Sequence, residues 1–145
     1  RMQIIKHIQT IEAHSFLDSL TELPNRRKFD YQIKYEWHRA IRKGTKIGLL
    51  MMDLDDFKAY NDTYGHAQGD VMLQAVARVL KATLKRNTDV PCRWGGEEFA
   101  VLIPETSTKE VLLIAEMLRS GIAQLEVPCQ GTGEATKITV SIWAV

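Results

Sequence analysis

Residues 90–103 read VPCRWGGEEFAVLI, and this stretch decides how the chain folds. Two runs suited to β-strands, at residues 90–94 and 98–103, flank the paired glycines Gly95 and Gly96. Glycine tolerates positive φ angles, so a Gly-Gly pair favours a tight turn between antiparallel strands. The pattern therefore predicts a β-hairpin that carries carboxylates at its tip.

A central strand is predicted upstream of this hairpin. Residues 47–52 form a nearly continuous apolar run that ends at Asp53. Such a run is typical of a buried strand whose carboxyl end delivers an acidic side chain to a site. A polar loop containing Gly65 is expected next, and a last strand is expected over residues 137–145.

Helices are predicted between these strands from the spacing of apolar residues. We expect them over residues 24–44, 69–86 and 107–125. In the third, Ser107 and Glu110 resemble a capping box. The core-facing stripe expected on the first helix consists of Phe29, Ile33, Trp37 and Ile41.

The resulting order of elements predicts an α/β sandwich, with helices over a central, mostly antiparallel sheet. The chain has 145 residues, 45% of them hydrophobic, which is enough for one substantial core. Residues 1–17 are expected to be a connector helix from a missing upstream region, and residues 18–145 the domain itself. The connector would carry Ile4, Ile5, Ile8 and Ile11 on one stripe, which equally suits a dimer coil or a terminal packing helix.

Charge and cysteine content narrow the functional classes. The net charge is +1, from 19 basic and 18 acidic residues, which argues against a surface for nucleic acid. Cys92 and Cys129 belong to no CxxC pair, so we expect reduced thiols in a cytoplasmic domain. The longest apolar run is too short to span a bilayer, so a membrane would be reached only through the missing upstream region.

Oxygen-bearing side chains gather after the central strand. Mg²⁺ suits such a segment, because it takes one or two carboxylates and leaves its other positions to water and phosphates. Acids at the hairpin tip are candidates for a second carboxylate. Taken separately, an Asp-rich loop or a Gly-Gly-Glu-Glu turn is also typical of a solvated turn. The residues in question are Asp53, Asp55, Asp56, Asn61, Asp62, Asp70, Glu97 and Glu98.

Three ordered motifs together resemble the GGDEF family of diguanylate cyclases, in its GGEEF variant. The signature is RWGGEEF at residues 93–99. It follows an N-terminal motif, DSLTELPNRR at residues 18–27, and a nucleotide-binding segment, DLDDFKAYND at residues 53–62, with Gly65-His66 and Gly69-Asp70. The resemblance implies a fold related to the palm of nucleotidyl cyclases and polymerases.

The resemblance also implies roles for individual residues. The metal, Mg²⁺ or Mn²⁺, would be held by Asp53, the backbone oxygen of Leu54 and Glu97, with Glu98 as a second-ranked ligand. Glu97 would also accept the proton of a 3′-hydroxyl group, and Lys58 would neutralise phosphate charge. The substrate site would be formed by Asn61, His66, Asp70, Gly95 and Gly96.

Two further motifs have competing interpretations. Arg86 and Asp89 resemble the family's RxxD inhibitory site for the product, although in isolation such a motif is usually a surface ion pair. Asp18, Arg26 and Arg27 are interpreted as structural, forming a buried or half-buried ion pair that anchors the N-terminal motif.

The sequence departs from the family pattern near its end. Ser141-Ile142 is followed by Trp143, where the family has glycine. The last helix, with basic residues for the triphosphate, and the closing strand are missing, so we expect a fragment or truncated domain of low activity.

The resemblance implies an enzyme that condenses two GTP into cyclic di-GMP and two pyrophosphates as a homodimer. The alternative is a catalytically silent module that binds GTP or cyclic di-GMP. The intact acids favour catalysis, whereas the missing basic helix favours silence. A purely structural dimerisation domain would leave Asn61 and Asp70 unexplained.

Overall fold

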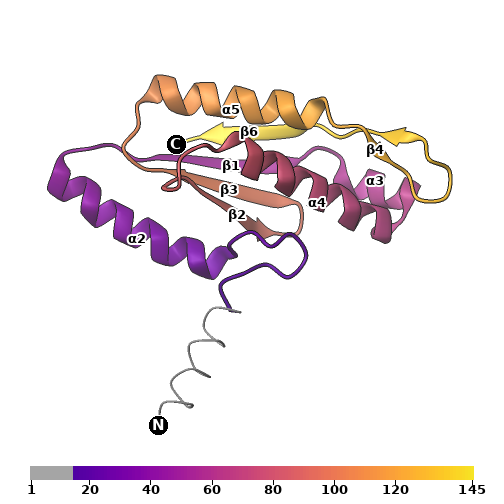
Figure 1. Ribbon diagram of the computed structural model, residues 1–145, viewed down its shortest axis with the longest axis horizontal. Coiled ribbons are helices and arrows are strands. Elements are labelled where there is room, and N and C mark those ends of the chain that lie inside the picture. Colours follow the sequence, from indigo (N-terminus) through magenta and orange to yellow (C-terminus); the bar gives the residue numbers. More distant parts are fainter. Residues whose placement is uncertain (1–14) are drawn as a thin grey trace, which may run out of the picture.

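The computed structural model describes residues 15–145, so the isoleucine stripe of the expected connector helix lies outside the described residues. A four-stranded sheet with the order β2-β3-β1-β6 forms the centre of the domain (Figure 1). Its neighbouring strands all pair antiparallel, which confirms the predicted sheet. The strands are β1 (Gly48–Leu54), β2 (Val90–Gly95), β3 (Glu98–Ile103) and β6 (Val140–Ala144).

Helices cover both faces of this sheet (Figure 1). One face packs against α2 (Arg26–Lys43), and the other against α4 (His66–Thr83) and α5 (Thr108–Ala123). A short helix, α3 (Phe57–Tyr64), follows β1 directly and packs beside α4. The expected α/β sandwich is therefore confirmed.

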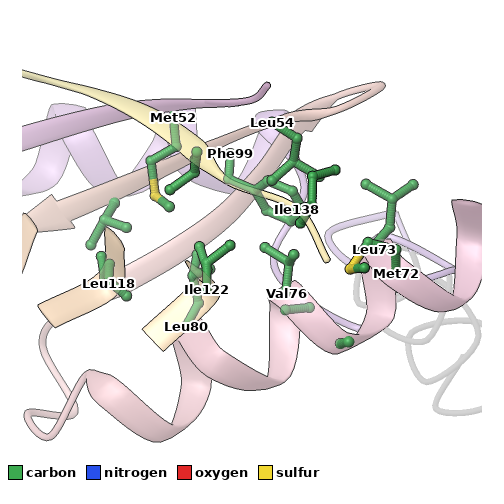
Figure 2. Packing of buried hydrophobic residues seen from close by; sticks show 14 of the residues in the cluster. Met52, Leu54, Met72, Leu73, Val76, Leu80, Phe99, Leu118, Ile122 and Ile138 are labelled. Carbon is green, nitrogen blue, oxygen red and sulfur yellow. The ribbon is translucent and has the colours of Figure 1, made fainter. Parts of the chain in front are cut away.

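The larger hydrophobic core lies between the sheet and the α4–α5 layer (Figure 2). Figure 2 shows Met52, Leu54 and Phe99 of the sheet facing side chains of the two helices. A smaller cluster fills the opposite face under α2, where Phe29 contacts the sheet. The helix side chains drawn in the larger core include Met72, Leu73, Val76, Leu80, Leu118 and Ile122.

The predicted core face of α2 is only half right. Phe29 is buried and Ile33 is partly buried, but Trp37 and Ile41 are 57% and 66% exposed. Successive steps of four residues turn a helix by about 40° more than a full circle, so the assumed stripe drifts away from the core. The buried positions in its place are Glu36 and Ala40.

Two segments differ from the prediction. The expected polar loop after β1 is largely the helix α3, which buries Phe57 and Tyr60, and α4 begins at His66 rather than Gly69. Near the end of the chain, β4 (Val127–Pro128) and β5 (Ala135–Thr136) form a small separate sheet. The last strand of the main sheet is therefore shorter than residues 137–145.

Side chains cap two of the helices as their sequences suggest. Asn25 accepts a hydrogen bond from the backbone nitrogen of Lys28 at 3.0 Å, and this contact begins α2. Ser107 accepts one from the nitrogen of Glu110 at 3.2 Å and begins α5. The reciprocal half of the expected capping box is replaced by a bond from the Thr106 hydroxyl to Glu110.

Candidate functional site

The carboxyl end of β1 meets the tip of the β2–β3 hairpin. Asp53 is the direct antiparallel partner of Glu98 in the register of β1 and β3. One residue further, the backbone nitrogen of Leu54 donates to the carbonyl oxygen of Glu97 at 3.2 Å. Side chains of directly opposed residues share one face of a sheet, so this pairing brings two acids together.

This pair of acids fits a hard cation. Like charges directly opposite each other destabilise a sheet, and a divalent ion between them would remove that repulsion. Within residues 15–145 no three His, Cys, Asp or Glu side chains form a ready-made metal cage. Mg²⁺ requires none, because it completes its shell with water and substrate phosphates.

The other aspartates after β1 have different surroundings. The carboxylate of Asp55 accepts hydrogen bonds from Thr139 at 2.7 Å and Ser141 at 2.6 Å, which ties β1 to the approach of β6. Asp56 precedes α3 with a positive φ of 53°. Lys58 lies in the first turn of α3 and is exposed to solvent.

Three residues of the predicted substrate site, Asn61, His66 and Asp70, come from α3 and α4, which pack against each other. The side chain of Asn61 fills a notch at Gly69, where an added Cβ would lie 1.8 Å from Asn61 Oδ1. Among the described residues, that buried oxygen has no hydrogen-bond partner. His66 and Asp70 are both exposed and lie one turn apart on α4. Asp70 directly follows Gly69, the residue that forms the notch.

The two glycines of the turn are in different conformations. Gly96 has a φ of 48°, which favours glycine, whereas the φ of Gly95 is not in the left-handed region. Within residues 15–145, a Cβ on either residue would meet no atom within 4 Å apart from those of its chain neighbours. The backbone conformation at Gly96 therefore favours glycine, and the space over Gly95 is open.

Arg93 connects this turn to the N-terminal motif, a role that sequence reasoning missed. Its guanidinium donates to the carbonyl oxygen of Gly96 at 2.9 and 3.2 Å. The same group donates to both carboxylate oxygens of Asp18 at 3.2 and 3.3 Å. We call this arrangement the Asp18–Arg93 clamp. The only signal in the sequence is that both residues stand inside the quoted motifs.

The clamp corrects the expected ion pair of the N-terminal motif. Asp18 pairs with Arg93, whereas the guanidinium of Arg26 lies over the ring of Trp94 at 4.2 Å. Burial raises the pKa of the Asp18 carboxyl, but hydrogen bonds from Thr21 and Arg93 outweigh it, so this pKa lies below its ordinary value.

Arg86 and Asp89 of the RxxD motif form an ion pair with each other. Arg86 donates to Asp89 at 2.7 and 3.1 Å, to the carbonyl oxygen of Glu105 at 3.3 Å, and to that of Pro104. The Asp89 side chain is only 3% exposed. The hydrogen bond between Arg86 and Asp89 raises the pKa of the Arg86 guanidinium. A ligand would reach the partly exposed guanidinium before it reached the carboxylate.

Comparison with known proteins decides the family. The sequence model described as "Diguanylate cyclase, GGDEF domain" matches residues 15–145. The chain belongs to this family.

Relatives of the GGDEF domain are longer proteins. YhcK of Bacillus subtilis is 40% identical over 92% of this chain, which covers 36% of YhcK. The diguanylate cyclase VdcA of Vibrio cholerae is 36% identical over 97% of this chain, which covers 40% of VdcA. The chain thus spans little more than a third of the length of these relatives.

Solved structures show the same fold. The coiled coil and GGDEF domain of DgcB from Caulobacter crescentus, in complex with c-di-GMP, is 30% identical. It superposes with a TM-score of 0.91 over 99% of this chain and 75% of its own. In the described part of this GGDEF domain, no helix is both long and apolar enough to cross a membrane.

Proposed function

We propose that this GGDEF domain condenses two molecules of GTP into cyclic di-GMP. The observation that carries the proposal is the pairing of Asp53 with Glu98 beside a glycine turn with open space over it. Acids at one strand end suit phosphoryl transfer, in which charge must be neutralised at attacking and leaving oxygens. The name of the Vibrio cholerae relative, a diguanylate cyclase, supports the same reaction.

In this proposal, Mg²⁺ or Mn²⁺ would be held by Asp53, the Leu54 backbone oxygen and Glu97, with Glu98 as a second-ranked ligand. The bound ion would supply positive charge to the oxygens around the reacting phosphorus. Glu97 accepts the proton of a 3′-hydroxyl group, whose oxygen attacks the α-phosphorus of the second GTP. The bond to the β-phosphate breaks, and pyrophosphate leaves. The 3′-hydroxyl group of the second GTP then attacks the α-phosphorus of the first in the same way. A second pyrophosphate leaves, and the ring is closed.

The guanine base would be read between α3 and α4. Asp70 accepts hydrogen bonds from the base N–H groups, and Asn61 lies beside it in the notch at Gly69. His66 lines the same pocket, and Lys58 neutralises charge on the phosphates. Adenine lacks the N–H pattern that Asp70 requires, so the pocket would select GTP.

Each domain holds one GTP, so catalysis needs a homodimer in which two loaded domains face each other. We also propose product feedback at Arg86 and Asp89. For that, the Arg86 guanidinium has to turn from Asp89 and the two carbonyl oxygens toward the ligand. The c-di-GMP complex of the Caulobacter relative supports product binding by domains of this fold. We place the domain in the cytoplasm, with any membrane attachment in an upstream region.

The direct test is incubation of the chain with GTP and Mg²⁺, followed by chromatography of the nucleotides. Asp53→Asn and Glu97→Gln should abolish cyclic di-GMP formation, because each removes a carboxylate of the proposed site. Glu126→Gln, an exposed acid between α5 and β4, is the matched control and should retain turnover. Binding of GTP or cyclic di-GMP without turnover by the unaltered chain would favour the silent module and contradict the enzyme.

A further inference from the structure

A network of buried polar side chains connects α3, α4 and the β4–β5 hairpin. Gln68 of α4 and Thr136 of β5 are 1% and 2% exposed, and Tyr60 of α3 is also buried. Polar groups this deep are costly unless they are hydrogen-bonded to one another. The β4–β5 hairpin lies beside α3 and α4, so three separate elements meet at these side chains (Figure 1).

Each hydrogen bond of this network has a defined donor and acceptor. The Thr136 hydroxyl donates to the carbonyl oxygen of Val127 at 2.7 Å, which leaves it only as an acceptor toward Tyr60. The Tyr60 hydroxyl lies 2.7 Å from Thr136 Oγ1 and must therefore be the donor. Its oxygen in turn accepts from Gln68 Nε2 at 3.3 Å. Hydroxyl groups aligned in one direction reinforce each other.

The amide of Gln68 is fixed at both ends. Its oxygen accepts from the backbone nitrogen of Gln130 at 3.0 Å, and its nitrogen donates to the carbonyl oxygen of Pro128 at 3.0 Å. A backbone N–H can only donate, so the orientation of the amide is determined. We call the connected groups, Gln68, Tyr60, Thr136 and the Val127 carbonyl, the Gln68 relay.

The relay residues stand next to the proposed guanine readers. Tyr60 precedes Asn61 on α3, and Gln68 precedes Gly69 and Asp70 on α4. Asn61 Oδ1 has no hydrogen bond to any residue in the part of the chain that the structure describes, so the packing of the two helices determines where it lies. A shift of α3 against α4 would therefore change the distance between Asn61 and Asp70.

We propose that the Gln68 relay is a positioning device that sets the guanine specificity of the pocket. It joins α3, α4 and the β4–β5 hairpin by directed hydrogen bonds and so fixes the gap between the two helices. Its residues are positioning residues, because they act through Asn61 and Asp70. This inference rests on the proposed guanine pocket.

The test compares Thr136→Val, which removes the hydroxyl at nearly constant shape, with Thr136→Ser, which retains it. Calorimetry gives the affinity of each full chain for GDP and for IDP, which lacks the 2-amino group of guanine. Neither probe is consumed by the proposed reaction. We expect Thr136→Val to weaken GDP binding roughly five- to tenfold and to narrow the preference for GDP over IDP. Thr136→Ser should bind as the unaltered chain does.

Tyr60→Phe is the second variant, because it keeps the buried ring and removes only the central hydroxyl. It should show the same narrowed preference. GDP and IDP affinities unchanged in both variants, beside a lowered Tm, would overturn the inference and make the relay a stabilising contact alone. An unaltered chain that does not prefer GDP to IDP would overturn the guanine pocket and the relay's role together.

Discussion

Two adjacent glycines in the β2–β3 turn satisfy different requirements. Gly96 has a positive φ, which a residue with a Cβ adopts only at a cost, whereas Gly95 has open space above an ordinary backbone. The need for glycine at Gly95 therefore lies outside the fold itself. In the proposed function, this space admits the substrate.

Alanine at the two positions should separate these requirements. Gly96→Ala should lower the free energy of unfolding by about 1 kcal/mol, because alanine is strained at a positive φ. Gly95→Ala should change that free energy by less than about 0.5 kcal/mol. It should still lower cyclic di-GMP formation by about a hundredfold, because its methyl group displaces the substrate. Urea unfolding and turnover measured on the same two variants check both expectations.

The pair of variants serves as its own control. A Gly95→Ala chain that unfolds like the unaltered protein and forms product at an equal rate would contradict a substrate over this turn. Equal losses of stability in both variants would contradict the difference in backbone conformation.

Contacts between residues were predicted better where a local sequence pattern placed each residue at the end of a strand. The acids at the end of β1 and at the hairpin tip were expected to meet, and the register of Asp53 with Glu98 brings them together. The Asp18–Arg93 contact joins residues 75 positions apart, and no local spacing reports it. The motif indicated that Arg93 matters without indicating its partner.

At the scale of elements, the strands were predicted more accurately than the helix faces. A continuous apolar run indicates a buried strand regardless of register, so β1 was found, and the paired glycines between two strand-like runs indicated the hairpin. The assumed stripe of α2 failed because its four-residue spacing drifts away from the core. One position buried in its place is Glu36, an acid ion-paired with Arg39 that hydrophobicity alone would place outside. The helix α3 was missed because only Phe57 and Tyr60 mark its apolar side.

The Asp18–Arg93 clamp joins two elements, the N-terminal motif and the hairpin, and it predicts a pH dependence. The pKa of Asp18 is lowered in the folded chain below its ordinary value of 3.8. The carboxylate therefore stabilises the fold above this ordinary value, and this contribution is lost as the pH falls through the lower, folded value. The difference in Tm between the unaltered chain and Asp18→Asn should thus shrink on acidification from about pH 6 to pH 3.

Asp30→Asn, an exposed acid of α2, is the matched control for this experiment. Its Tm should follow that of the unaltered chain more closely across the same range. A Tm difference for Asp18→Asn that is independent of pH would show that Asp18 stabilises the fold by shape rather than by charge.

In the whole molecule, the hydrophobic core and the proposed reactive groups lie in different places. The large core under α4 and α5 holds the sheet, and the proposed reactive groups stand at one end of β1 and the adjoining hairpin. One such end offers a single pair of strand acids. In the proposed function, joining two nucleotides into a symmetric ring would therefore need two copies of the domain, each presenting one GTP.

The most direct test of this account is the initial rate of cyclic di-GMP formation from GTP and Mg²⁺, measured against chain concentration. If two loaded domains have to meet, doubling a low chain concentration should raise the rate about fourfold, because the dimer population follows mass action. The effect should level off once the chain is fully dimeric. A rate that only doubles at every concentration while the chain remains monomeric, or no product at all, would contradict the account.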